Sequence, residues 1–115
     1  MMAENMKVYQ KWEDLAKYLY KALQSYPKSE KFTIAADTRQ ALMQVGRHIY
    51  RANNVSKMEK RKEIEAADIA LVDLKLLIRL GMVLEFMPIK KYELASEQAV
   101  EIGRMLGGWL KNSIA

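Results

Sequence analysis

The chain has 115 residues, of which 50% are hydrophobic and 29% are charged, with only two prolines and five glycines. This length and composition predict one domain with a sizeable core and few long irregular stretches. The formal net charge of +5 permits nucleic-acid binding without demanding it, and the absence of cysteine excludes disulfides, thiolate nucleophiles and thiolate metal ligands.

The chain starts with a polar stretch, Met1 to Lys7, which lacks the apolar run of a signal peptide. Charged residues interrupt the longest apolar stretches farther on, so we expect no transmembrane span. A chain without cysteine also fits a reducing compartment. These features predict a cytoplasmic protein.

The first helix is expected over residues 8–25, where apolar residues recur at alternating spacings of four and three. This stripe consists of Val8, Trp12, Leu15, Leu19, Ala22 and Tyr26. Pro27 cannot continue the helix and biases the residue before it away from helical angles. Ser29 is a favourable N-cap for a following helix, so a short connection is expected here.

A second helix is expected over residues 30–53, with Phe32 among its apolar positions. Arg39 and Gly46 lie on the same stripe as the apolar residues. Because that stripe faces the core, we expect Arg39 to be structural and paired to a carboxylate. Residues 55–62 are charged and lack apolar periodicity, so a linker is expected there.

The third helix is expected over residues 62–86 and is the longest. Apolar residues form one stripe in its first half but spread around the helix in its second half, as is typical of a helix with more than one partner. The residues that widen the stripe are Ile69, Val72, Leu76, Leu77, Leu80, Met82, Val83 and Leu84. Pro88 ends the helix. This surface exceeds what one bundle can bury and predicts self-association.

The fourth helix is expected over residues 89–111, with an apolar stripe at heptad spacing. One edge of that stripe carries only small residues, which allow another backbone to come close. With a nearby tryptophan, they are the predicted oligomer interface: Ala95, Ala99, Gly103, Gly107 and Trp109. Each glycine of Gly107-Gly108 costs about 1 kcal/mol relative to alanine in a helix. Either the helix frays there, or the glycines let Trp109 pack closely against a neighbour.

Four helices, short connections and no strand signal predict an all-α protein. Because short connections make neighbouring helices antiparallel, the expected fold is an up-down-up-down four-helix bundle. Residues 1–115 are expected to form this single domain, since there is no internal repeat at solenoid spacing and no low-complexity tract.

Positive charge is concentrated near the end of the second predicted helix and in the linker after it. Guanidinium groups pair well with phosphate oxygens, and only Glu59 interrupts the cations of the linker. The candidate nucleic-acid-binding residues are Arg47, Arg51, Lys57, Lys60, Arg61 and Lys62. The alternative is that these residues form a solvated face without function.

Side chains for the chemistry of known helical bundles are missing. The only histidine, His48, has Val45 three residues before it, which excludes the Glu-x-x-His pairs of di-iron bundles. Its arginine neighbours make His48 a poor general base. Three carboxylates share one face of the fourth helix: Glu93, Glu97 and Glu101. They form either a metal or catalytic cluster, or a face that lies in solvent or in an interface. We predict a protein that is not an enzyme, with no catalytic residue, cofactor or metal.

Several motifs together identify a resemblance that covers nearly the whole chain. They are Tyr26-Pro27-Lys28-Ser29-Glu30-Lys31-Phe32, Thr38-Arg39, Ala67-Asp68-Ile69, Ile89-Lys90-Lys91-Tyr92-Glu93 and Ile102-Gly103-Arg104-Met105-Leu106-Gly107-Gly108-Trp109-Leu110-Lys111. The sequence resembles the accessory variability determinant proteins of diversity-generating retroelements. These belong to a wider four-helix-bundle family that includes proteins encoded in intervening sequences of bacterial large-subunit ribosomal RNA genes. The last motif is the most specific and points to the accessory branch.

The resemblance implies a ring-like homo-oligomer, a homopentameric barrel of four-helix bundles with a basic surface. It also implies binding to a reverse transcriptase and to RNA or DNA, in support of mutagenic copying of template RNA into DNA. Contacts to phosphates would make this binding weakly sequence-specific. The alternatives are a self-associating scaffold for a protein partner, without nucleic-acid binding, and a regulator of the toxin or ribosomal-RNA-associated kind. Of the first two, only nucleic-acid binding predicts an affinity that falls with salt.

Overall fold

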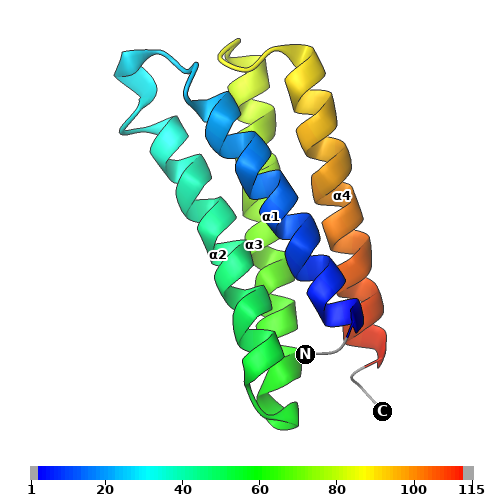
Figure 1. The fold of residues 1–115 in the computed structure, drawn as a ribbon. Coiled ribbons are helices and arrows are strands. Elements are labelled where there is room, and N and C mark those ends of the chain that lie inside the picture. Colours follow the sequence, from blue (N-terminus) through cyan, green and yellow to red (C-terminus); the bar gives the residue numbers. More distant parts are fainter. Residues whose placement is uncertain (1–2, 113–115) are drawn as a thin grey trace.

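A computed structural model of the chain describes residues 3–112 (Figure 1). Its helices are α1 (Ala3–Leu23), α2 (Ile34–Asn54), α3 (Lys57–Val83) and α4 (Ile89–Asn112), with one 3₁₀ turn, Lys28–Glu30, between α1 and α2. No strand occurs within residues 3–112. The predicted all-α fold with four helices is therefore confirmed.

Successive helices run in opposite directions, so the start of α1, the end of α4 and the turn between α2 and α3 share one end of the bundle (Figure 1). We call this the α2–α3 end. Each helix packs against the next, and α1 also packs against α4. The molecule measures 46 × 24 × 19 Å, and its long dimension matches the roughly 40 Å expected of a 27-residue helix.

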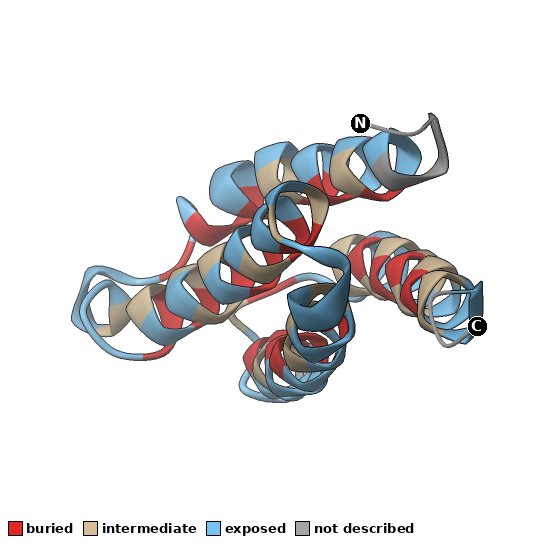
Figure 2. Cartoon of the chain, turned by 90° about the horizontal axis from the view of Figure 1, so that it is seen from below, coloured by how far each residue is buried: buried red, intermediate tan, exposed pale blue. Residues whose placement is uncertain are grey.

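The core lies along the axis of the bundle, where each helix contributes one buried stripe (Figure 2). Leu15, Leu42, Leu74 and Ile102 represent the four helices and are fully buried. Burial of each such side chain stabilises the fold by about 1.5–3 kcal/mol. Most charged residues lie on the outer faces, which also expose several large apolar side chains, among them Ile69, Val72 and Leu76. None of the helices within residues 3–112 has the length and hydropathy of a membrane span.

The predicted linker over residues 55–62 is mostly helix. Asn54 ends α2, and α3 already begins at Lys57, so only Val55 and Ser56 lie between the two helices. The backbone N–H groups of Glu59 and Lys60 donate to the Ser56 carbonyl, both at 3.0 Å. This stretch lacks apolar periodicity, but most of its residues are strong helix formers, and that propensity extends the helix toward its N-terminus.

The connection between α1 and α2 is longer than predicted, because α2 begins at Ile34. Ser29 does not cap α2; its hydroxyl donates to the Glu30 carboxylate at 3.1 Å, and the Thr33 hydroxyl donates to the same carboxylate at 2.9 Å. Glu30 thus organises a local turn. Phe32 lies within this connection and is 91% exposed, so its expected place in a helix is wrong.

Candidate nucleic-acid interface

The structure brings the candidate nucleic-acid-binding residues to the α2–α3 end. Arg47 and Arg51 lie on the last turns of α2, and the four cations of the former linker lie on the first turns of α3. Because α2 and α3 are antiparallel neighbours joined by two residues, these turns lie beside each other (Figure 1). All of the candidates are exposed except Lys60, which is half-buried.

Few of these positive charges are neutralised inside the chain. Arg61 Nε lies 3.7 Å from Glu65 Oε1, and both side chains are about half exposed, so the pair contributes at most about 0.5 kcal/mol. None of the ion pairs found among the described residues involves Arg47, Arg51 or Lys62. Their charges are therefore available to an anionic partner.

His48 is next to Arg47 in sequence but has a structural role. Its Nδ1 lies 2.9 Å from Glu63 Oε2, and both side chains are mostly buried, so the pair joins α2 to α3. Arg39 was expected to have a similar role. It is half-buried, but no ion pair within residues 6–112 includes it, so the expected carboxylate partner is not found there.

Arg47 and Arg51 also line a groove between α1 and α2 that the sequence did not predict. We call it the aromatic groove, and it encloses about 330 Å³. Its other lining residues are Tyr9, Trp12, Met43, Gly46 and Tyr50. The Tyr9 ring centroid lies 5.5 Å from that of Trp12 and 5.9 Å from that of Tyr50, distances typical of favourable aromatic pairs.

The inner side of the aromatic groove is held in place by Trp12, which is only 8% exposed. Its indole N–H donates to the backbone carbonyl of Leu42 at 2.9 Å. The ring lies against Gly46, where an added Cβ would overlap ring carbons. The missing side chain at Gly46 therefore allows α1 to approach α2, and Trp12 cannot move without breaking this packing.

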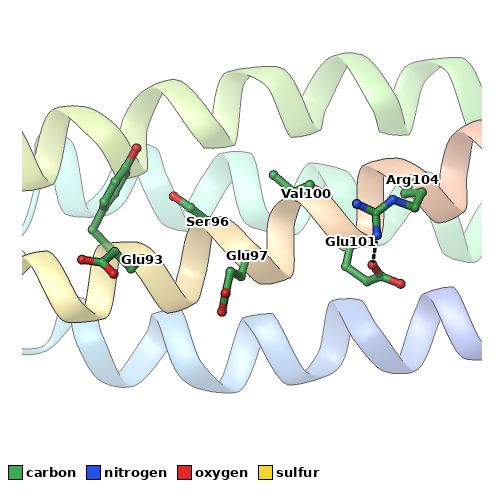
Figure 3. Close-up of a pocket in the computed structure, with 7 residues that line it drawn as sticks. Glu93, Ser96, Glu97, Val100, Glu101 and Arg104 are labelled. Atoms are coloured by element: carbon green, nitrogen blue, oxygen red, sulfur yellow. Dashed lines mark hydrogen bonds and ion pairs between the residues drawn. The ribbon is translucent and has the colours of Figure 1, made fainter.

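The three carboxylates of α4 lie along one side of the helix. They line a depression on the outer side of the helix, together with Tyr92, Ser96, Val100 and Arg104. Figure 3 shows the three glutamates on successive turns without a shared focus, and the Glu101 carboxylate accepts a 2.7 Å hydrogen bond from Arg104. Among the described residues, no group of three His, Cys, Asp or Glu side chains could hold a metal ion.

Tyr92, at the same depression, links α4 to α3. Arg79 Nη1 donates to the Tyr92 hydroxyl at 3.4 Å. Hydrogen bonds from Ser96 and then from Arg79 lower the pKa of Tyr92, against a smaller opposing effect of burial. These contacts attach the start of α4 to α3.

The small-residue edge of α4 is used within the chain. Ala95 and Ala99 have no exposed surface, so a second chain cannot reach them. A Cβ added to Gly103 would lie 3.3 Å from a methyl carbon of Leu71, which places Gly103 against α3. The small side chains therefore bring α4 close to the other helices of its own bundle. The sequence pattern predicted an external partner because periodicity alone does not distinguish an internal neighbour from an external one.

The end of α4 continues past its two glycines to Asn112, so the helix does not stop at Gly107. No atom of the residues that the structure describes would lie within 4 Å of a Cβ at Gly107 or Gly108. Trp109 is half-buried and packs against the core. Of the residues predicted for an oligomer interface, Gly107 alone is fully on the surface, since Gly103 and Trp109 are half-buried.

A different apolar surface runs along the outer face of α3. Its residues are spaced three, four, four and three apart and are between 41% and 66% exposed: Ile69, Val72, Leu76, Leu80 and Val83. Helical periodicity places this α3 stripe opposite the core stripe that contains Leu71, Leu74 and Ile78. A contiguous exposed apolar surface is typical of an interaction site.

Comparisons with known proteins agree with this fold. A family model described as bAvd-like, for bacterial accessory variability determinant, matches residues 6–113. The crystal structure of a protein of unknown function from the S23 ribosomal protein family, from Bacteroides thetaiotaomicron VPI-5482, has a TM-score of 0.86 and 16% sequence identity. That likeness covers 94% of this chain and 98% of the other, and at this identity it shows the fold alone. A search of curated proteins found no match.

Proposed function

Because this chain belongs to the bAvd-like family, we propose that it is a nonenzymatic accessory protein of a diversity-generating retroelement. In this role it binds a reverse transcriptase and nucleic acid and supports mutagenic copying of RNA into DNA. The observation that carries the nucleic-acid part is the group of exposed cations at the α2–α3 end, most of them without an ion pair to any other described residue.

These cations suit a phosphate backbone. Arginine can bind a phosphate through two parallel hydrogen bonds, and lysine adds a flexible point charge. Such contacts position a strand without reading its bases, so binding is weakly sequence-specific. Each phosphate that is neutralised releases counterions, so the affinity falls as salt rises.

Self-association belongs to the same proposal. The α3 stripe offers a second copy of the chain an apolar surface that the monomer leaves in water. In a ring, each subunit repeats the basic α2–α3 end around the axis, and a moderate charge per chain becomes a continuous basic surface. The number of five subunits comes from the family resemblance.

A scaffold without nucleic-acid binding is the second candidate, because the α3 stripe by itself favours a protein partner. Both candidates require protein contacts through apolar surface. They differ in whether the cations of the α2–α3 end contribute to binding.

The test replaces Arg47, Arg51, Arg61 and Lys62 with alanine and measures binding to single-stranded and duplex RNA and DNA. A matched control removes the same number of positive charges at the opposite end of the bundle. The control replaces four exposed lysines with alanine: Lys17, Lys21, Lys28 and Lys31. The proposal expects a large loss of affinity in the first variant and a small loss in the control. Equal losses in both would mean that net charge, and not the α2–α3 end, accounts for binding, and a parent protein that binds no nucleic acid would favour the scaffold.

Binding to reverse transcriptase is tested by co-expression with the polymerase of a diversity-generating retroelement, followed by co-purification after nuclease treatment. Retention of the polymerase supports a direct protein contact. Loss of the polymerase after nuclease treatment would mean that nucleic acid alone bridges the two proteins, and would contradict the proposed direct binding.

A further inference from the structure

The aromatic groove contains exposed aromatic side chains, which contacts between cations and phosphates do not require. Tyr50 is 54% exposed and Tyr9 is half-buried, so both rings reach the surface. Trp12 and Met43 lie with them along the same groove. Contact between the Tyr9 and Tyr50 rings continues an aromatic surface from α1 to α2.

Arg47 and Arg51 place positive charge along the same groove. They are four residues apart on α2, which puts their Cβ atoms about 5–6 Å apart on one side of the helix. Neither takes part in an ion pair among the described residues. The groove therefore combines exposed aromatic side chains with two available guanidinium groups.

A polyanion that carries flat aromatic rings matches both features. In single-stranded nucleic acid the bases expose faces that stack on aromatic side chains, while basic residues follow the backbone. In a duplex the faces of the bases are already stacked on one another and do not reach an open groove. Charge and ring chemistry together therefore favour an unpaired strand over a duplex.

We propose that the aromatic groove binds an unpaired nucleobase of a single-stranded RNA or DNA, stacked on Tyr50 and Tyr9, with the flanking phosphates on Arg47 and Arg51. This inference rests on the proposed nucleic-acid binding and specifies where an unpaired base is held. The cations at the start of α3 then bind the continuing backbone, at the same end of the bundle.

One acidic residue beside the groove allows a test in which removal of a negative charge should strengthen binding. Glu13 follows Tyr9 by one helical turn on α1, which places its carboxylate near that ring. Burial, then this carboxylate and then Tyr50 raise the pKa of Tyr9. Glu13 is exposed. A negative charge at this position repels phosphate, and Glu13→Gln should strengthen the binding of a single strand.

The decisive experiment compares Tyr50→Leu, Tyr50→Phe and the parent protein. Tyr50 is exposed, and its replacement leaves the core intact. The probes are a short single-stranded RNA, an abasic strand of equal length and charge, and a duplex. Tyr20→Leu is the control. Tyr20, on α1, is exposed like Tyr50 but does not line the groove.

Stacking of one base predicts that Tyr50→Leu binds the single-stranded RNA about tenfold more weakly, whereas Tyr50→Phe and Tyr20→Leu bind like the parent. The abasic strand and the duplex should not distinguish Tyr50→Leu from the parent. Equal single-strand affinity of Tyr50→Leu and the parent would overturn the proposal. So would a Tyr50→Leu variant that loses only its co-purification with reverse transcriptase, since the groove would then hold a protein.

The measurements on the parent protein distinguish a wrong stacking site from a wrong proposed function. If the parent binds every strand with strong salt dependence and Tyr50 has no effect, only the stacking site is wrong. If the parent binds no nucleic acid at any salt concentration, the proposed nucleic-acid function and the stacking site are both wrong.

Discussion

The indole ring of Trp12 on α1 lies directly against Gly46 on α2, where any β-carbon would overlap ring atoms. The same indole donates a hydrogen bond to the Leu42 carbonyl, one turn earlier on α2. These two contacts of Trp12 hold α1 close to α2 and form the inner side of the aromatic groove. Fold and candidate site therefore depend on the same pair of residues.

Gly46→Ala should lower the free energy of unfolding by about 1–3 kcal/mol, because the added methyl group displaces the Trp12 ring. Gly108→Ala is the matched control. No atom of residues 3–112 would lie within 4 Å of its Cβ, and alanine is the better helix former, so this change should stabilise the protein by about 0.5–1 kcal/mol. Urea unfolding at equal protein concentration measures both, and a Gly46→Ala variant as stable as the parent would contradict the packing described.

Tyr26 and Gly81 form a second close contact, at the other end of the bundle. The Tyr26 hydroxyl is buried, has no hydrogen-bond partner within the described part of the chain, and lies where a Cβ at Gly81 would be. An unsatisfied buried polar group costs about 1–3 kcal/mol, so Tyr26→Phe should be at least as stable as the parent. Gly81→Ala should destabilise the parent more than the Phe variant, a coupling that a double-mutant cycle measures.

The same hydroxyl predicts a dependence of stability on pH. Burial raises the pKa of Tyr26 above its ordinary value of 10.0. The folded state therefore holds this proton more tightly than the unfolded state, and stability should fall as pH rises above about 10. Tyr26→Phe removes this contribution, so its stability should fall less than that of the parent over the same range. Identical pH profiles would show that Tyr26 is not buried in the folded protein.

Glu85 lies just past the end of α3 with a φ of 65°, in the left-handed region. The Phe86 N–H donates to the Gly81 carbonyl at 2.9 Å and the Glu85 N–H to the Met82 carbonyl at 2.9 Å, the Schellman arrangement that usually contains glycine. Glu85→Gly should therefore stabilise the protein by about 1 kcal/mol. Glu97→Gly removes the same charge in the middle of α4 and should destabilise it by about 1 kcal/mol.

Thermal unfolding of the Glu85 and Glu97 variants gives the comparison directly. A destabilising effect of Glu85→Gly would mean that the Glu85 side chain contributes a contact worth more than the backbone strain. Equal effects of both variants would mean that charge, and not backbone conformation, decides their stability.

The α3 stripe predicts self-association. Val72→Lys with Leu76→Lys should reduce the molar mass measured by light scattering while helical circular dichroism stays unchanged. Leu94→Lys with Val100→Lys on α4 adds the same charge at exposed apolar positions outside the stripe and should keep the assembly. A parent protein that remains at its chain mass of 13.3 kDa at micromolar concentration would contradict the prediction.

The family and the helical fold could be predicted from the sequence because their signals are local. The core positions of α1 repeat at helical spacing from Val8 to Ala22, and all of them are buried. Proline after α1 and after α3 separates the helices. The motif that ends at Lys111 identified the accessory family, and the family model confirms it.

The parts that were missed depend on which element lies beside which. Trp12 meets Leu42 across thirty residues of sequence, so the aromatic groove exists only after α1 and α2 have packed. Ala95 and Ala99 repeat with a spacing that suits an internal or an external neighbour equally. The start of α3 at Lys57 was missed for another reason, since this stretch is helical without having an apolar stripe.

In the proposed function, the cations of the α2–α3 end bind phosphates. The most direct measurement is the affinity for a single-stranded RNA over a salt series, for the parent and for the variant with alanine at Arg47, Arg51, Arg61 and Lys62, after light scattering has shown equal assembly. The parent should lose affinity with a log–log slope of roughly −0.7 per phosphate contacted, and the variant should bind more weakly with a shallower slope. An affinity and slope equal to those of the parent would make these residues a solvated face and contradict the claim.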